Sequence, residues 1–372
     1  MDLDEFAEKD QEETRVAELV AQVSDKNRRI DEYQADTRRL QRLLAISDER
    51  ISDLEDDLQT ITQIKEMDAY VPDWLDFEPE PSGPDTAVAW LTLSDLHPDE
   101  VVDIDEMDGL NKFNREIAEM RLERVVNRTI RVLETYAAGV AFDGIVVALA
   151  GDIITGVIHD ELEATNEAPV PETIMHWAPI IAAALRTLAD YFGQVFVPCV
   201  DGNHDRMYKK IRSKQRSTSS YAWIIYHSLT WLLSDDERIT FSISKSPEQI
   251  VPVYSTRFLL THGDQFRSQG GVGGIYPPML KWLNRKMNVR TFDIAIIGHW
   301  HQLLYDPQIF VNGSLKGYDE YARDRGFAPE RPQQMLFIVT PENGVTAQYK
   351  VFADSKDEGW QAPEAAQSPW GS

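Results

Sequence analysis

Five short polar motifs, each placed just after an apolar, β-branched segment, constrain the fold of this chain most. Such segments are typical of buried strands, so the polar residues after them would lie at the carboxyl ends of strands. In order, the motifs are Asp95-Leu96-His97, Gly151-Asp152, Gly202-Asn203-His204-Asp205, His262-Gly263-Asp264 and Gly298-His299-Trp300-His301. Ligands collect at the carboxyl ends of strands in α/β sheets. The sequence therefore predicts an α/β domain in which five distant segments meet.

The segments between the motifs alternate between two patterns. Helices are expected where apolar residues recur every three or four positions, at 111–137 and 172–191. Strands are expected at 87–93, 145–150, 195–200, 257–261, 294–297 and 308–311. Two further strands, 334–340 and 345–351, flank Pro341-Glu342-Asn343-Gly344, which is a hairpin signal. Alternating strands and helices favour a layered α/β domain.

Ahead of this domain, residues 16 to about 64 carry a heptad pattern. Eleven of the fourteen a and d positions from Val16 to Ile61 are apolar, and no Gly or Pro interrupts them. Seven heptads in one register favour a coiled coil, most simply a homodimer. The alternative is a helix that folds back on its own domain. We expect a coiled-coil helix over 1–65, an acidic Pro-rich linker over 66–86, the α/β domain over 87–352 and a disordered tail over 353–372.

The residue types in the motifs are those of a metal centre. Carboxylate, imidazole and amide oxygen suit Mn²⁺, Fe²⁺, Zn²⁺ or Ni²⁺ better than Mg²⁺ alone. A carboxylate can bridge two metals about 3.5–4 Å apart, and such a pair lowers the pKa of a bridging water for attack on phosphorus. Each motif alone is weakly specific, but the five motifs in this order are together a strong signal. We expect an enzyme that binds two divalent ions, Mn²⁺ foremost, and hydrolyses a phosphoester with a metal-bridging hydroxide.

The order of the motifs resembles the signature of the calcineurin-like metallophosphoesterase superfamily. That signature is Asp-x-His, Gly-Asp, Gly-Asn-His-Asp/Glu, His and Gly-His-x-His, and the resemblance covers about residues 87 to 315. It implies a fold of two packed mixed β-sheets flanked by helices. Within the superfamily, the chain looks most like the phage-encoded, DNA-repair-exonuclease-like members.

The resemblance also implies roles for the residues of the motifs. Two ligand sets would share Asp152 as a bridge. The first set would be Asp95, His97, Asp152 and His301. The second set would be Asp152, Asn203, His262 and His299. His204 would contact the phosphate and stabilise or protonate the leaving oxygen, and Asp205 is placed in the sequence to orient His204.

A run of cations follows the third motif. Six Lys and Arg residues fall within Arg206–Arg216, among them Arg206, Lys209 and Lys210, although the formal net charge of the chain is -25. They predict an edge that grips phosphates, and a solvated loop is the alternative. His159, seven residues after Asp152, is a further candidate for substrate contact, with an exposed loop histidine as the alternative. The Gly-rich segment 268–275 is expected to form a lid.

These features leave three functions open. The leading one is a phosphodiesterase with nuclease-like activity on DNA. The second is a phosphatase or cyclic-nucleotide phosphodiesterase, which the acidity favours because a negative surface repels nucleic acid. The third is a coiled-coil scaffold with a vestigial catalytic domain, and the complete ligand set counts against it. With no apolar run of roughly 20 residues, no signal-like start and a lone Cys199, we expect a soluble, cytoplasmic protein with no membrane contact.

Overall fold

The computed structural model describes residues 86–266 and 276–355, together with scattered helical residues between Arg15 and Ile51. The chain divides into two compact units, Met1–Asp68 and Ala69–Ser372. Most of the expected coiled coil, the linker, the lid and nearly all of the tail lie outside the described residues and stay predictions. In the part of the chain that is described, every helix is too short or too polar to span a bilayer.

The second unit contains a six-stranded mixed sheet. Its strands in spatial order are β11 (Gly344–Phe352), β10 (Gln333–Thr340), β1 (Thr86–Leu93), β2 (Ala141–Ala150), β3 (Val195–Val200) and β4 (Ile239–Ile243). Strands β1 to β4 run parallel to one another, whereas β10 is antiparallel to both of its neighbours. Because β1, β2 and β3 each end just before a motif, the first three motifs lie along one edge of this sheet.

The remaining strands form a five-stranded mixed sheet. Its spatial order is β5 (Glu248–Val253), β6 (Thr256–Thr261), β7 (Ile294–Ile297), β9 (Ile309–Val311) and β8 (Leu304–Asp306). Strands β6, β7 and β9 are parallel, and β5 and β8 are antiparallel to their neighbours. The fourth motif begins directly after β6 and the fifth directly after β7.

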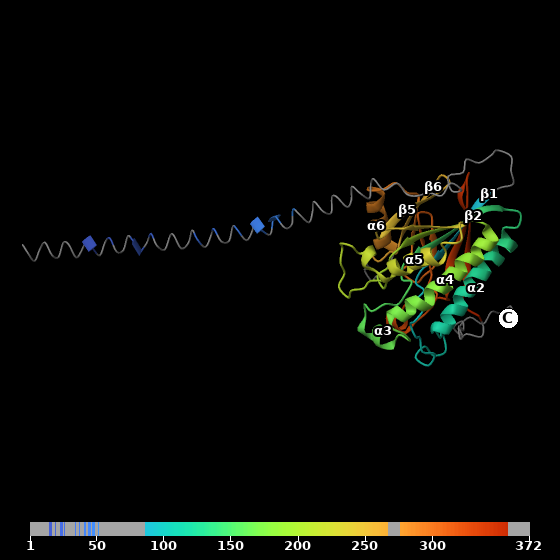
Figure 1. Ribbon diagram of the computed structural model, residues 1–372, viewed down its shortest axis with the longest axis horizontal. Helices are drawn as coiled ribbons and strands as arrows, with labels where there is room; N and C mark the ends of the chain where they lie inside the picture. Colours follow the sequence, from blue (N-terminus) through green and yellow to red (C-terminus); the bar gives the residue numbers. More distant parts are fainter. Residues whose placement is uncertain are drawn as a thin grey trace, which may run out of the picture. The chain divides into compact units, whose positions relative to one another are not determined.

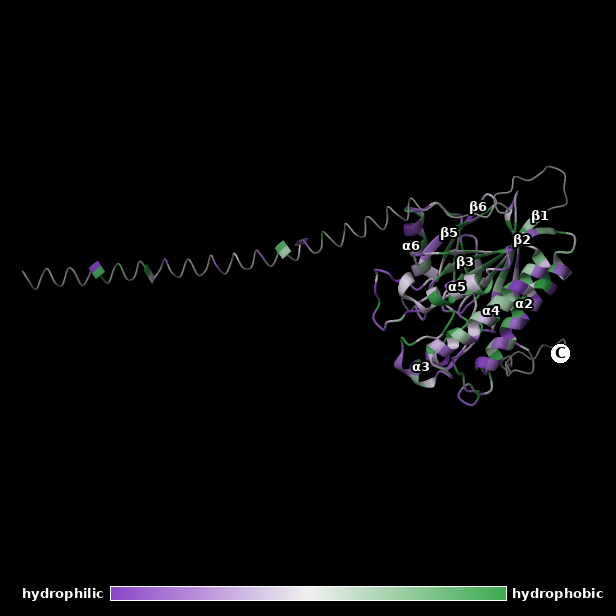
Figure 2. Ribbon diagram, viewed as in Figure 1, coloured by the Kyte–Doolittle hydropathy of each residue, from purple (hydrophilic) through white to green (hydrophobic). Residues whose placement is uncertain are grey.

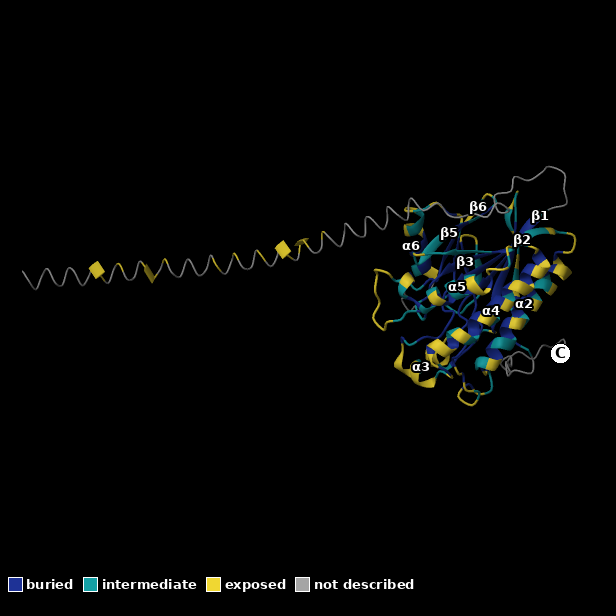
Figure 3. Ribbon diagram, viewed as in Figure 1, coloured by how far each residue is buried: buried dark blue, intermediate teal, exposed yellow. Residues whose placement is uncertain are grey.

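Alternating side chains join the two sheets face to face. In β1, Val88 and Trp90 belong to the core between the sheets, whereas Ala89 and Leu91 belong to the core under the helices. The ring of Trp90 lies 4.7 Å from that of Phe258 in the other sheet, measured between centroids. Figure 2 shows the hydrophobic strands, and Figure 3 shows that they are buried.

Helices cover both outer faces. The first sheet packs against α2 (Arg115–Tyr136), α4 (Val170–Phe192) and α5 (Tyr221–Leu232), and Figure 1 shows α2 and α4 side by side. The second sheet packs against α6 (Tyr276–Met287). The short helices α3 (Asp160–Thr165) and α7 (Glu320–Asp324) lie in connecting segments. The expected class, two packed mixed sheets flanked by helices, is confirmed.

Side-chain caps set where α2, α5 and α7 begin. The side chain of Asn114 accepts a hydrogen bond from the N–H of Ile117 at the start of α2. Ser220 caps α5 in the same way through the N–H of Trp223. Caps of this kind satisfy backbone donors that have no partner inside the helix.

The sequence patterns located most strands but missed three. Strands β3 and β7 have the expected bounds, and β10 and β11 form the expected hairpin. Strands β4, β5 and β8 were not expected. They are half-buried along most of their length, so the apolar pattern that marks a strand is weak in them.

A buried arginine fastens the segment after β9 to α2. The guanidinium of Arg121 donates hydrogen bonds to the carbonyl oxygens of Leu315 (3.0 Å) and Lys316 (2.6 Å). It also donates to the side chain of Asn111, at 2.9 Å. Arg121 is fully buried, so its charge is stabilised by these acceptors and not by water.

Replacing this arginine is expected to destabilise the fold. In Arg121→Leu the carbonyl oxygens of Leu315 and Lys316 lose their charged donor, which should lower the free energy of unfolding by about 3 kcal/mol. Urea unfolding of the full chain measures the change. The control is Arg131→Leu, because Arg131 is exposed on the same helix, and its effect should stay within about 0.5 kcal/mol. Equal effects in the two variants would contradict the buried role of Arg121.

Candidate metal centre

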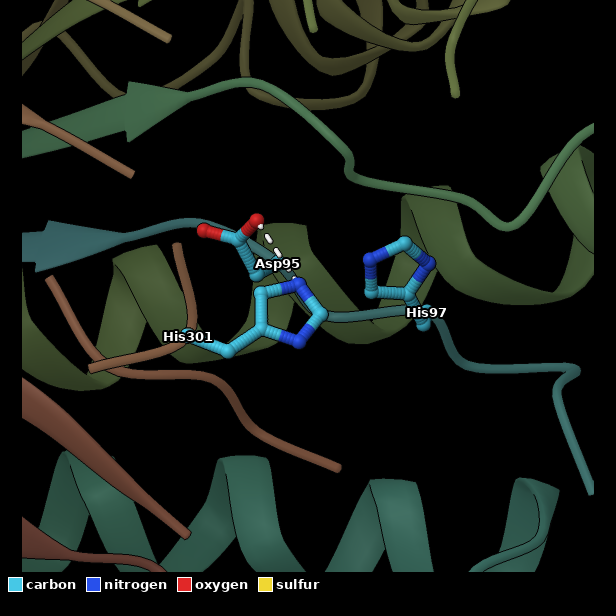
Figure 4. A group of neighbouring side chains, drawn as sticks. All are labelled: Asp95, His97 and His301. Carbon is cyan, nitrogen blue, oxygen red and sulfur yellow. Dashed lines mark ion pairs between the residues drawn. The ribbon is translucent and has the colours of Figure 1, made fainter. Parts of the chain in front are cut away.

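The first group of candidate ligands draws on both sheets. Asp95 and His97 follow β1, His301 follows β7, and their ligand atoms all lie within 4.8 Å of one another. Figure 4 shows the imidazole of His301 facing the carboxylate of Asp95, and their Nε2 and Oδ1 atoms are 3.2 Å apart. Burial raises the pKa of Asp95, but its hydrogen bond with His301 and the nearby histidine charges outweigh burial and bring the pKa below its usual value.

The second group also draws on both sheets. Asp152 follows β2, His262 follows β6, His299 follows β7, and their ligand atoms again lie within 4.8 Å of one another. The side-chain oxygen of Asn203 lies 3.1 Å from Nε2 of His262. Burial lowers the pKa of His262, but the charge of Asp152 overcomes this and raises the pKa to about 10.

One oxygen of Asp152 faces both groups. Its Oδ2 atom lies 2.9 Å from Nε2 of His262 and 4.0 Å from Nε2 of His97. Burial raises the pKa of Asp152, but the neighbouring histidines lower it by more than burial raises it. The pKa of Asp152 therefore lies well below its usual value. A carboxylate that is ionised and shared in this way has the geometry needed to bridge two cations.

His97 shows that the site fits a metal ion. The side chain is buried, and neither of its ring nitrogens has a hydrogen-bond partner among the described residues. A buried polar atom without a partner costs about 1–3 kcal/mol, so such atoms call for an explanation. A cation held with Asp95 and His301 would give one of these ring nitrogens a partner.

Backbone strain is concentrated on the same residues. Eight described residues other than glycine have a positive φ, and five of these are candidate ligands. The five are Asp95 (φ 53), His97 (φ 44), Asp152 (φ 50), His299 (φ 69) and His301 (φ 53). The left-handed conformation costs a non-glycine residue about 1–3 kcal/mol and persists at functional sites, where the surroundings impose it.

Glycines of one motif make room for carboxylates of another. A Cβ atom on Gly298 would lie 2.5 Å from Oδ2 of Asp95 and from the hydroxyl of Ser94. A Cβ atom on Gly202 would overlap the carboxylate of Asp152. The two Gly-initiated motifs therefore need glycine for space, because φ at Gly202 and Gly298 lies outside the left-handed region.

The structure brings His204 to the site, but Asp205 does not orient it. Nδ1 of His204 donates to the carbonyl oxygen of Thr155, at 2.9 Å, and the ring meets that of His97 edge-on with centroids 4.8 Å apart. The prediction for Asp205 was wrong, because its carboxylate instead accepts from the backbone N–H groups of Gly202 (2.7 Å) and Asp152 (2.9 Å). Asp205 therefore ties the second and third motifs together.

The candidate substrate residues have different surroundings. Arg206 is half-buried and donates to the carbonyl oxygen of Asn203, at 2.8 Å, whereas Lys210 is exposed. His159 is exposed at the start of α3, and its ring centroid lies 5.5 Å from that of His204. Lys209 is exposed but pairs with two acids of α3.

Lys209 forms ion pairs with Asp160 and Glu163, the latter at 2.8 Å. The rim of the site beside His204 therefore carries acids as well as cations. Sequence patterns do not reveal such a pairing, because the two segments are more than forty residues apart.

The role of Arg216 was also missed. It was expected to belong to a phosphate-gripping edge. Instead the guanidinium pairs with Asp201 at 2.8 Å and with both oxygens of Asp264 at 2.9 and 3.0 Å. It therefore clamps the segment of the third motif to that of the fourth. The signal available in the sequence was the pair of acids beside two motifs, which require a counter-charge.

Comparison with known proteins finds distant structural neighbours. No family model and no curated protein matches the chain. A single mutant of Vps29 from Entamoeba histolytica is 14% identical, with a TM-score of 0.30, and the match covers 70% of this chain and 98% of that one. Vacuolar Protein Sorting 29 from Cryptosporidium parvum is 13% identical, with a TM-score of 0.28, covering 72% and 98%.

A third neighbour is a conserved uncharacterized protein from Streptococcus pneumoniae, described as a predicted phosphoesterase. It is 12% identical, with a TM-score of 0.23, and the match covers 70% of this chain and 97% of that one. What the site of the present chain can do follows from its own geometry.

The space around the ligands yields a prediction. In Gly298→Ala the new methyl group should displace the carboxylate of Asp95 and weaken Mn²⁺ binding by about tenfold or more, as calorimetric titration would measure. The control is Gly139→Ala, which meets no atom within 4 Å but has a strained φ of +95. It should lower stability by about 1 kcal/mol and leave Mn²⁺ binding unchanged. Unaltered Mn²⁺ binding in Gly298→Ala would show that Asp95 is not a ligand.

Proposed function

We propose that this protein is a metal-dependent phosphoesterase of the calcineurin-like metallophosphoesterase superfamily. The observation that carries the proposal is the position of Asp152, whose Oδ2 atom faces a histidine from each of two ligand groups. Two divalent ions bound there would activate a water and stabilise negative charge on phosphorus-bound oxygens during an in-line displacement.

The ligand groups support an assignment of residues to ions. Asp152 would be shared between the two ions. One ion would be held by Asp95, His97, His301 and Asp152, and the other by Asp152, Asn203, His262 and His299. Mn²⁺ is the metal we propose, with Fe²⁺, Zn²⁺ and Ni²⁺ as further candidates, because the set mixes carboxylate, imidazole and amide oxygen.

His204 is the residue we propose for contact with the reacting phosphate. Because Nδ1 donates to the carbonyl oxygen of Thr155, the other ring nitrogen remains for the substrate. The edge-on contact with His97 keeps the ring beside the first ligand group. When the ring carries a second proton, its Nε2–H can donate to a phosphate oxygen and stabilise the leaving oxygen as the ester bond breaks.

For the substrate we propose a phosphodiester, with a DNA strand as the leading candidate. The support is the basic segment Arg206–Arg216, which starts directly after the third motif and carries the exposed Lys210. Exposed cations beside a catalytic site attract the phosphates of a strand. His159, whose ring lies near that of His204, would reach the phosphate beside His204.

A small phosphoester, such as a cyclic nucleotide, is the second candidate. It is favoured by the ion pairs of Lys209 with Asp160 and Glu163, because acids at the rim repel a long polyanion more than a small one. The formal net charge of -25 acts in the same direction.

The first test of the proposal is removal of the shared carboxylate. Asp152→Asn should lose Mn²⁺-dependent cleavage of bis-p-nitrophenyl phosphate down to background and bind fewer than two Mn²⁺ ions per chain, because the amide cannot bridge. Metal content is measured by mass spectrometry after dialysis. The same chemical change at an exposed surface position, Asp235→Asn, should leave turnover and metal content unaltered. Cleavage that survives in Asp152→Asn would exclude the proposed centre.

The second test separates the two substrate classes. Linear, single-stranded and nicked DNA are each added with Mn²⁺ to the protein while it cleaves bis-p-nitrophenyl phosphate. A nuclease should cut the DNA, and the DNA should inhibit its cleavage of the reporter. Lys210→Ala should reduce the salt dependence of that inhibition by the amount expected for the loss of about one phosphate contact. Undiminished reporter cleavage and intact DNA would instead select the small phosphoester.

A further inference from the structure

His97 and Glu100 face each other inside the protein. A backbone turn, closed by the hydrogen bond from the N–H of Glu100 to the carbonyl of His97 at 3.1 Å, folds the acid back over the histidine. Oε2 of Glu100 then lies 3.5 Å from Nδ1 of His97. Both atoms are buried, and neither has a hydrogen-bond partner among the described residues. A shift of less than about 1 Å would bring them to hydrogen-bond distance.

The other oxygen of Glu100 is fixed by a buried lysine. Nζ of Lys316 lies 2.5 Å from Oε1 of Glu100 and 2.5 Å from Oδ2 of Asp319. Lys316 is itself held by its backbone, because Arg121 and Asn111 both donate to its carbonyl oxygen. All three charged side chains are buried, so the position of Glu100 is set by the core and not by solvent.

Two other histidines of the site show how an oxygen beside Nδ1 holds the ring proton on that nitrogen. Nδ1 of His262 donates to the carbonyl oxygen of Ala150, and Nδ1 of His204 donates to that of Thr155. In each ring the proton is thereby held on Nδ1, and Nε2 faces the site. At His97 the corresponding oxygen belongs to Glu100, a carboxylate and therefore a stronger acceptor than a carbonyl.

We propose that Glu100 is a positioning residue of the metal centre, whose Oε2 atom accepts the Nδ1 proton of His97 and leaves Nε2 directed at the first ion. The inference rests on the proposed function and concerns the ligands of the same site. A ligating histidine commonly donates its second N–H to a carboxylate, which fixes the tautomer and makes the ring a stronger ligand. Lys316 holds Glu100 in place for this purpose.

Two isosteric variants separate positioning from plain charge balance. Glu100→Gln and Asp319→Asn each remove one negative charge from beside Lys316, but only Glu100 faces His97. Asparagine is also an adequate helix cap, so the hydrogen bond from the N–H of Ala322 at the start of α7 is retained in Asp319→Asn. In Glu100→Gln, Lys316 requires the amide oxygen, so the amide NH₂ group would turn to Nδ1 of His97.

The first measurement is the tautomer of His97 in the metal-free full chain. Nitrogen-15 spectra of histidine-labelled protein report which ring nitrogen carries the proton, and His97→Gln identifies the signals. We expect the proton on Nδ1 in the wild type and in Asp319→Asn, and on Nε2 in Glu100→Gln. A wild-type His97 protonated only on Nε2 would overturn the inference, and this result requires no variant at Glu100 to fold.

The second measurement is Mn²⁺ binding by calorimetry. Glu100→Gln should weaken one of the two Mn²⁺ ions by about 10–100-fold, whereas Asp319→Asn should bind both as the wild type does. If both variants weaken Mn²⁺ binding equally, or if Glu100→Gln does not weaken it, Glu100 is only a counter-ion of Lys316 and the inference fails. If the wild type binds no Mn²⁺, the proposed function fails, while the tautomer still decides whether Glu100 orients His97.

Discussion

The repulsion among three buried carboxylates is the constraint on which the site depends. Asp95, Asp152 and Asp205 are buried at the carboxyl ends of β1, β2 and β3. Carboxylates taken out of water must be paired or neutralised. Asp95 and Asp152 gain histidines, whereas burial and the charge of Asp152 raise the pKa of Asp205 to about 7. The loops of the site have shapes that bring each carboxylate its partner.

The strained backbone is a result of this convergence. Residues such as Asp95 and Asp152 must turn toward a common point within a few residues of a strand end, and positive φ values are the means by which they do so. The packed core between the sheets, with Trp90 against Phe258 and Phe337, holds the strand ends firmly enough to maintain that strain.

The candidate ligands could be predicted from the sequence, but the residues that support them could not. A strand pattern followed by Asp, Asn or His is visible within one segment, so the two groups around Asp95 and Asp152 were anticipated. The partners of Lys209 and Arg216 depend on contacts between distant segments, which no local pattern reports. Asp205 was misread for a related reason. Adjacent residues after a strand point in different directions, and its carboxylate turns to backbone amides of another motif.

Neither sheet alone carries a complete ligand group. Asp95, His97 and Asp152 come from the first sheet, and His262, His299 and His301 come from the second. Any ion that needs ligands from both sides binds only after the two sheets have packed, and it then holds them together. Such an ion would stabilise the folded state by a free energy that rises with the logarithm of the ratio between its free concentration and its dissociation constant. Metal supply would thus govern how long the assembled protein survives.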